Sequence, residues 1–200
     1  MKKFNTQAFV EIALLMAITI VMSFTPLGTL RTPFMNISLV TIPVAVAAII
    51  VGPVGGTIVG FTFGMCSFIS ALTGASGMLS TLFVISPVGV FITAVVTRTL
   101  EGLLVGLIFK GLKKLKLKAA SYYIASICCP VLNTLLFMSC IVIFFYNTDY
   151  VQGLVSGLGA TNVFMFVVLL VGVQAVVEAV AALIIAGSVS LALSKALRRY

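Results

Sequence analysis

Four polar side chains lie inside otherwise apolar stretches, and their types suit the binding of a small solute. Arg98 occurs in FITAVVTRTLEGLLVG, Asn133 in CCPVLNTLLFM, and both Gln174 and Glu178 in GVQAVVEAVAA. A planar guanidinium binds a carboxylate or phosphate through two parallel hydrogen bonds, and the amides supply donors and acceptors for amide or hydroxyl groups. The set predicts a cavity for a small organic anion.

The same residues could also have a purely structural role. Glu101 lies three residues after Arg98 on the same helix face, so the two could form an intrahelical ion pair. Glu178 shares a face with Gln174, four residues earlier, and could accept a hydrogen bond from a ligand hydroxyl or only hold Arg98. Because isolated polar residues in membrane helices often link helices to one another, both interpretations stay open.

Membrane helices must position these residues. Of the 200 residues, 62% are hydrophobic and 8% are charged, a balance far from that of soluble domains. A spanning helix needs about 20 apolar residues, and six runs are long enough: about 8–25, 37–53, 54–74, 85–109, 120–146 and 162–194. The expected fold is an all-α integral membrane protein, with residues 1–200 forming a single six-helix domain.

The positive charges predict how these spans are oriented. Apart from Arg31 and Arg98, the lysines and arginines lie at the start of the chain, at 110–118, and at 195–199. Such residues are retained on the cytoplasmic side, so both termini and the 110–118 loop are expected there. The segments 26–36, 75–84 and 147–161 then face outward. Arg98 lies about 20 Å below the outer end of its span, where an ionised group marks a site or a pathway.

The first run is expected to remain as a span and not to be cleaved as a signal peptide. Glu11 interrupts the approach to its apolar core, and no clean A-x-A site follows near Ser23. The four cysteines show no C-x-x-C spacing and are expected to be small buried hydrophobic residues; they are Cys66, Cys128, Cys129 and Cys140.

Several function classes are disfavoured by what the sequence lacks. The chain has no histidine, which removes serine-histidine hydrolysis and most zinc sites. A phosphate-binding G-x-x-x-x-G-K loop is absent, because Leu112 follows Gly111 where lysine is required. The basic run KGLKKLKLK is short and lacks the aromatics of a nucleic-acid site. No catalytic residue, metal, cofactor or nucleic-acid partner is therefore predicted, and the chain is not expected to be an enzyme.

Small residues recur at four-residue spacing in three helices. The stretch GPVGGTIVGFTFG carries one such stripe, and RTLEGLLVGL carries a shorter one at Gly102 and Gly106. Residues four apart stack on one helix face and let another backbone approach closely. The first stripe is therefore expected to be a helix-packing groove formed by Gly52, Gly56, Gly60 and Gly64.

Two further sequence features concern helix contacts. Gly52-Pro53 is expected to form a tight cytoplasmic turn, which makes the spans 37–53 and 54–74 a close antiparallel hairpin. In the first span, Ala13 and Ala17 have the same small-residue spacing in IALLMAI. They either pack inside the protein or leave a smooth face for a partner helix.

The order of these features resembles the substrate-binding S component of energy-coupling factor (ECF) vitamin transporters. The block NISLVTIPVAVAAIIVGPVGGTIVGFTFGMCSFI is similar to the second and third helices of that family. The runs RTLEGLLVGLIFKGL, NTLLFM and EAVAALI are similar to runs in its pantothenate-type members. The resemblance implies a high-affinity binding subunit in the bacterial plasma membrane for uptake of a water-soluble vitamin, pantothenate above all. This vitamin has the carboxylate, hydroxyl and amide groups that the polar set would bind.

The resemblance also implies partners and a mode of action. Ala13 and Ala17 would dock a transmembrane coupling (T) subunit, and two cytoplasmic ATPase subunits would supply the energy, as in ABC transporters. The vitamin would be captured outside and released inside as the subunit topples in the membrane. Segments 26–36 and 75–84 would close over the captured vitamin, and Arg31 would either attract an anion or be merely solvated.

Three alternatives remain beside this reading. The same scaffold would suit riboflavin or another vitamin or precursor. A stand-alone secondary transporter or a channel is a rival class, although such carriers usually contain two related halves and no convincing internal repeat is present. An intramembrane enzyme is the third, disfavoured by having only four acidic residues.

Overall fold

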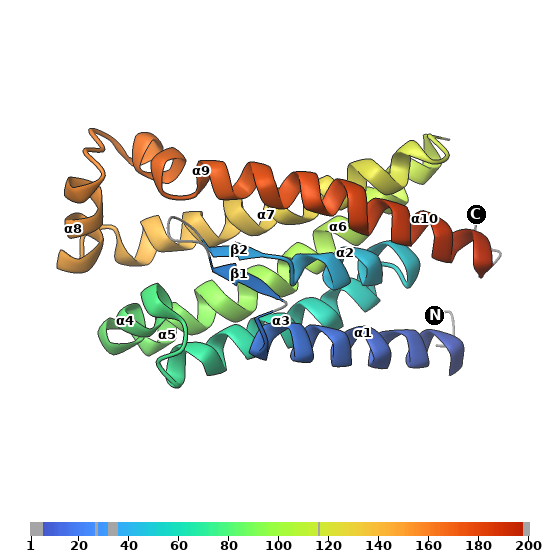
Figure 1. Ribbon diagram of the computed structural model, residues 1–200, viewed down its shortest axis with the longest axis horizontal. Coiled ribbons are helices and arrows are strands. Elements are labelled where there is room, and N and C mark those ends of the chain that lie inside the picture. Colours follow the sequence, from blue (N-terminus) through green and yellow to red (C-terminus); the bar gives the residue numbers. More distant parts are fainter. Residues whose placement is uncertain (1–5, 27, 32–35, 116, 198–200) are drawn as a thin grey trace.

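Long helices run side by side in the computed structural model of the chain, which describes residues 6–26, 28–31, 36–115 and 117–197 (Figure 1). Five helical runs are apolar and long enough to cross a membrane. They are Thr6–Phe24 (α1), Pro53–Leu72 (α3), Pro87–Lys114 (α5, η1 and α6), Ala120–Phe145 (α7) and Val163–Ala196 (α9, η2 and α10). Because a helix satisfies its own backbone hydrogen bonds in lipid, these runs confirm a multi-pass membrane protein.

Two of the long runs contain a π-helical turn. The first run divides into Pro87–Phe91 (α5), Ile92–Val96 (η1) and Thr97–Lys114 (α6). The last divides into Val163–Ala181 (α9), Ala182–Ala186 (η2) and Gly187–Ala196 (α10). Such single-turn bulges often occur at functional sites, and η1 ends two residues before Arg98.

The predicted span 37–53 differs most from the observed structure. It contains a strand, Asn36–Ser38 (β2), and a helix of only ten residues, Thr41–Ile50 (α2). Strand β2 pairs antiparallel with Thr29–Arg31 (β1). At 1.5 Å per residue α2 is about 15 Å long, half of a hydrocarbon core. The prediction of six full-length spans is therefore not matched by the described residues.

The reason is that protein, rather than lipid, surrounds this segment. Eight of the ten residues of α2 are buried, and Val44, Ala45 and Ala47 have no exposed surface. Irregular backbone at membrane depth is tolerated where protein covers it or where it lines a cavity. Helix α2 is covered by protein and Ser38 of β2 lines a cavity, and an apolar run alone cannot reveal either condition.

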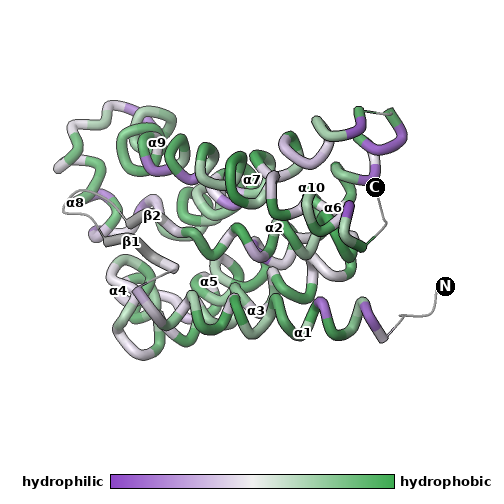
Figure 2. Tube along the Cα trace, turned by 45° about the vertical axis from the view of Figure 1, so that its right-hand side comes forward, coloured by the Kyte–Doolittle hydropathy of each residue, from purple (hydrophilic) through white to green (hydrophobic). Residues whose placement is uncertain are grey.

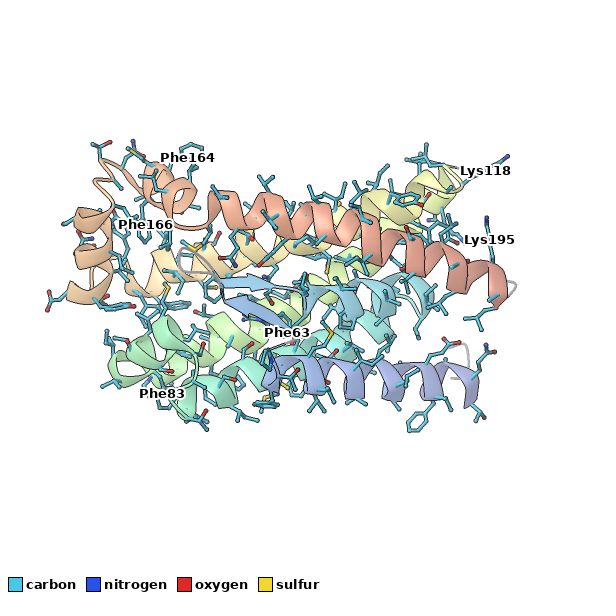
Figure 3. All side chains as sticks on the ribbon, in the orientation of Figure 1. Phe63, Phe83, Lys118, Phe164, Phe166 and Lys195 are labelled. Carbon is cyan, nitrogen blue, oxygen red and sulfur yellow. The ribbon has the colours of Figure 1, made fainter. Side chains whose placement is uncertain are left out.

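The two ends of the bundle differ in polarity. The start of α1, the turn after α6 and the end of α10 lie at one end, where Figure 3 shows Lys118 and Lys195. The short helices Gly77–Ile85 (α4) and Asp149–Gly157 (α8) lie at the other. The middle is mainly hydrophobic (Figure 2). The three cationic segments lie at the same end of the bundle. The chain therefore crosses the bundle an even number of times between one cationic segment and the next.

Helices α3 and α6 pack backbone to backbone through their glycines. A Cβ atom added to Gly56 would lie 2.3 Å from the carbonyl oxygen of Gly102. One added to Gly60 would lie 2.3 Å from the carbonyl oxygen of Arg98, and one added to Gly64 would lie 2.7 Å from the Cα of the η1 residue Val95. The two small-residue stripes of the sequence are therefore partners, and their contact positions the backbone of Arg98.

Gly52 does not belong to that stripe, contrary to the sequence prediction. It has φ +102°, and an added Cβ would meet nothing within 4 Å. This left-handed conformation favours glycine, and Pro53 follows as the first residue of α3. Gly52 thus serves the turn between α2 and α3. Gly106 packs against that turn, since an added Cβ would lie 2.5 Å from the Cα of Pro53.

Three apolar clusters form the core. One surrounds α2 and includes Val44 and Val105. A second lies toward α4 and α8 and includes Phe145 and Phe166, and a third, smaller one includes Phe109 and Tyr122. Figure 3 shows Phe63 in the middle of the bundle and Phe166 near the α8 end.

We expect Gly60→Ala to lower the free energy of unfolding by about 1–3 kcal/mol, because the new methyl group overlaps the Arg98 carbonyl and forces α3 and α6 apart. Thermal unfolding in detergent, followed by circular dichroism, measures the change. Gly111→Ala is the matched control, since a Cβ there meets nothing within 4 Å. Equal stability of the two variants would contradict the packing.

Candidate functional site

Three of the four predicted ligand residues line a cavity of about 320 Å³. Arg98 from α6, Asn133 from α7 and Gln174 from α9 line it, together with Ser38 of β2. Apolar side chains complete the wall: Phe63, Met78, Phe137, Met138, Leu170 and Val171. The volume is within the usual range for small-molecule sites.

This inner cavity shares lining residues with a wider hollow of about 1120 Å³. Six residues line both, Arg98 and Gln174 among them. The wider hollow extends to Ser23–Pro26 at the end of α1 and to Ala75–Leu79 at the start of α4. Of the two segments predicted to close over a ligand, Pro26 and residues 75–79 border the hollow.

Arg98 is buried without a carboxylate partner. Its side chain is 8% exposed, and its Cζ lies 4.5 Å from the ring centroid of Phe63 and 5.4 Å from that of Phe137. Nη1 donates to the carbonyl oxygen of Ala94 at 3.1 Å, while Nε is buried without a partner. Within the described ranges, no carboxylate oxygen lies within 4 Å of the guanidinium.

The structure therefore does not contain the ion pair between Arg98 and Glu101 that the sequence left open as a structural alternative. Glu101 is fully buried, and its Oε1 accepts a hydrogen bond from the Cys129 thiol at 2.9 Å, while Oε2 has no partner. Arg98 and Glu101 share a helix face, but they do not form a hydrogen bond to each other. The Glu101 carboxyl group accepts its hydrogen bond from the Cys129 thiol on α7 instead. Cys129 is thus a hydrogen-bond donor and not merely a small hydrophobic residue.

Glu178 does not line the cavity and contacts neither Arg98 nor the space where a ligand would lie. It is 2% exposed. Its Oε1 accepts two hydrogen bonds, from the backbone N–H of Ser38 at 2.7 Å and from Nε2 of Gln174 at 2.8 Å. The residue therefore joins α9 to the β1-β2 hairpin and contacts two of the cavity residues, Ser38 and Gln174.

Asn133 brings an acceptor to the cavity. Its Oδ1 is buried and has no hydrogen-bond partner, and the neighbouring Thr134 also lines the wall. An unpaired buried polar atom is costly, so this oxygen is suited to a ligand donor. The chemistry of the site is one cation, two amides and two hydroxyls inside an aromatic and aliphatic wall.

Sequence reasoning missed part of this wall. Phe63 and Phe137, which flank the guanidinium, are two of fifteen phenylalanines with no distinguishing spacing. Ser38 lay in an apparently continuous apolar run. Of the cysteines, Cys66 and Cys129 are buried, whereas Cys128 and Cys140 are partly exposed.

The predicted docking pair on α1 does not line the cavity or the wider hollow. Ala13 and Ala17 are exposed on α1, while Ile12 and Thr19 are its buried residues. The small-residue pair therefore faces outward rather than into the protein. The structure does not describe the side chain of Arg31. Its predicted attraction for an anion therefore stays a prediction. Among described side chains, no group of three potential metal ligands comes together.

We expect Cys129→Ala to destabilise the protein by about 1–2 kcal/mol, because it removes the donor to a fully buried carboxylate. The neighbouring Cys128→Ala is the control: this thiol is partly exposed and makes no hydrogen bond to a described residue, so its loss should cost no more than about 0.5 kcal/mol. Denaturation in mild detergent compares the two. Equal losses would show that the thiol-carboxylate bond contributes nothing.

Comparison with known proteins assigns the chain to a family. The search of curated proteins found no match to this chain. A family model described as "ECF transporter, substrate-specific component" matches residues 7–190. This range contains the cavity, the hairpin and nearly all of the five long helices. The chain therefore belongs to the family of substrate-specific components of ECF transporters.

Proposed function

We propose that this chain is the high-affinity subunit that binds pantothenate for uptake by an ECF-type transporter. Family membership makes it a membrane-embedded binding subunit that works with T and ATPase subunits; the choice of vitamin is the proposed step. The observation that carries it is the buried guanidinium without a carboxylate partner, because a pantothenate carboxylate would supply the missing charge through two hydrogen bonds.

The rest of the cavity supports a molecule of this kind. Pantothenate also has an amide and two hydroxyl groups, which suit the unpaired Asn133 Oδ1 and the amide of Gln174. Its two methyl groups suit a wall that includes Met138, Leu170 and Val171. A flat ring system such as that of riboflavin has no carboxylate for Arg98, and the guanidinium already lies over both Phe63 and Phe137.

The proposed orientation follows the positive charges. The end carrying Lys118 and Lys195 would face the cytoplasm, and the hollow beside α4 would open outward. The β1-β2 hairpin with α2 would complete a sixth crossing. Vitamin would enter beside α4, and the exposed face at Ala13 and Ala17 would dock the T subunit. The wider hollow gives the vitamin a route to Arg98.

We expect Arg98→Met to weaken binding of radiolabelled pantothenate by about 100-fold or more, since two charge-assisted hydrogen bonds are lost. Equilibrium binding to purified protein in detergent measures this. Lys110→Met removes one charge from the exposed end of the same helix and should change affinity less than about twofold. Thermal unfolding shows whether each variant is folded. Unchanged binding by folded Arg98→Met protein would overturn the proposal.

Native mass spectrometry of the protein purified in mild detergent tests the choice of vitamin directly. We expect a bound molecule with the mass of pantothenate, reduced in amount in Arg98→Met protein. A co-purified riboflavin, or another vitamin without an anionic group, would replace pantothenate as the substrate.

We expect Ala13→Trp and Ala17→Trp to keep pantothenate binding and to abolish uptake in cells, because a large side chain on the exposed face of α1 blocks a close helix contact. Ile143→Trp is the control, since this residue is 73% exposed on α7, away from α1. Loss of binding in the alanine variants, or equal loss of uptake in the control, would argue against docking at this face.

A further inference from the structure

We infer that Glu178 is a positioning residue that fixes the side-chain amide of Gln174, so that the cavity presents a hydrogen-bond acceptor to its ligand at this point. The inference deepens the proposed function and rests on it where it concerns the vitamin. It concerns α9, where the two residues are four apart, and β2, which holds Glu178 from the other side.

The direction of the amide follows from the chemistry of its partner. A glutamine amide has an oxygen that accepts and a nitrogen that donates, and it can be turned either way round. Glu178 Oε1 lies 2.8 Å from the Gln174 amide and also accepts from the backbone N–H of Ser38 at 2.7 Å. An ionised carboxylate has no proton to donate, so the nitrogen of Gln174 faces Glu178.

The opposite end of the amide is then available to a ligand. Gln174 lines both the inner cavity and the wider hollow. Its Oε1 makes no hydrogen bond to a described residue and is not among the buried polar atoms. The cavity therefore offers the Gln174 carbonyl oxygen to a ligand. An amide that could turn freely would offer either its oxygen or its N–H group.

The hairpin prevents this arrangement from reversing. The Ser38 N–H is a backbone donor and cannot become an acceptor, and Glu178 itself is 2% exposed, which leaves its carboxyl group little contact with water. Turning the Gln174 amide would set its carbonyl oxygen against the carboxylate oxygen. Two acceptors in contact repel, and both would lose a hydrogen bond.

A fixed acceptor at Gln174 means that the ligand must carry a hydrogen-bond donor at this point. Arg98 selects an anion, and Gln174 then selects a ligand with a hydroxyl or N–H group. A site built to bond a donor strongly rejects an analogue that lacks it, because its own acceptor stays unpaired. Pantothenate has three such donors, its two hydroxyls and its amide N–H.

The binding experiment uses pantothenate and three analogues, each with one donor methylated. In wild-type protein, we expect the analogue whose missing donor faces Gln174 to bind at least about 10-fold more weakly than pantothenate; a donor that faces Asn133 would give a second penalty, which Gln174→Met leaves in place. In Gln174→Met and Glu178→Met the first penalty should disappear. In Glu178→Gln it should persist, because the new amide oxygen can still accept from Ser38 and Gln174.

The double variant Gln174→Met/Glu178→Met separates positioning from general support of the fold. If Glu178 acts through Gln174, adding Glu178→Met to Gln174→Met changes the ratio of affinities no further. A merely structural Glu178 would weaken pantothenate and all three analogues equally. A penalty that is lost in Gln174→Met but survives in Glu178→Met would overturn the role in selectivity.

A second measurement needs no ligand. The chain has three glutamines, Gln7, Gln152 and Gln174, so side-chain amide NMR of protein labelled with ¹⁵N-glutamine gives three pairs of signals, and Gln174→Met assigns one. We expect the Gln174 amide protons to move upfield and to exchange faster with water in Glu178→Met, and to change little in Glu178→Gln.

The two measurements distinguish failure of this inference from failure of the proposed vitamin. Unchanged Gln174 signals in Glu178→Met would overturn the inference, whether or not pantothenate binds. Suppose instead that the Gln174 signals change in Glu178→Met but wild-type protein does not bind pantothenate. That result would support the fixed amide and reject pantothenate as the substrate.

Discussion

A single guanidinium buried in a membrane protein without a carboxylate in contact is the constraint around which the middle of this molecule is built. Removing such a charge from water costs on the order of several kcal/mol when it is not compensated. Arg98 recovers part of this through the Ala94 carbonyl and the faces of Phe63 and Phe137. The remainder is an attraction for an anion, which a binding subunit can use.

The acidic side chains nearby are held by other donors, which keeps the cation available. Glu101 is bonded to the Cys129 thiol, and Glu178 to Gln174 and the Ser38 backbone. Neither carboxyl group lies within 4 Å of the guanidinium, so the hydrogen-bonding edge of Arg98 is left to the cavity.

The backbone of the site is as specialised as its side chains. Gly60 allows α3 to touch the Arg98 carbonyl, so the helix that carries the cation is held by close backbone contact. A short buried helix and a two-stranded hairpin occupy the place of a full-length span, and β2 delivers the Ser38 N–H to Glu178. Irregular structure at this depth is possible because protein covers it on one side and the cavity adjoins it on the other.

The sequence by itself determined the membrane class, most of the long helices and the short list of polar residues, because hydropathy and helical periodicity are local properties. Arg98, Asn133 and Gln174 stood out as polar residues in apolar runs, and all three line one cavity. Only the tertiary structure decided their partners. Glu178 meets Ser38 across 140 residues, and Glu101 meets Cys129 across 28, and neither distance leaves a periodic signal in the chain. The length of α2 was likewise settled by what surrounds it: an apolar run facing lipid must span, whereas the same run covered by protein can be short.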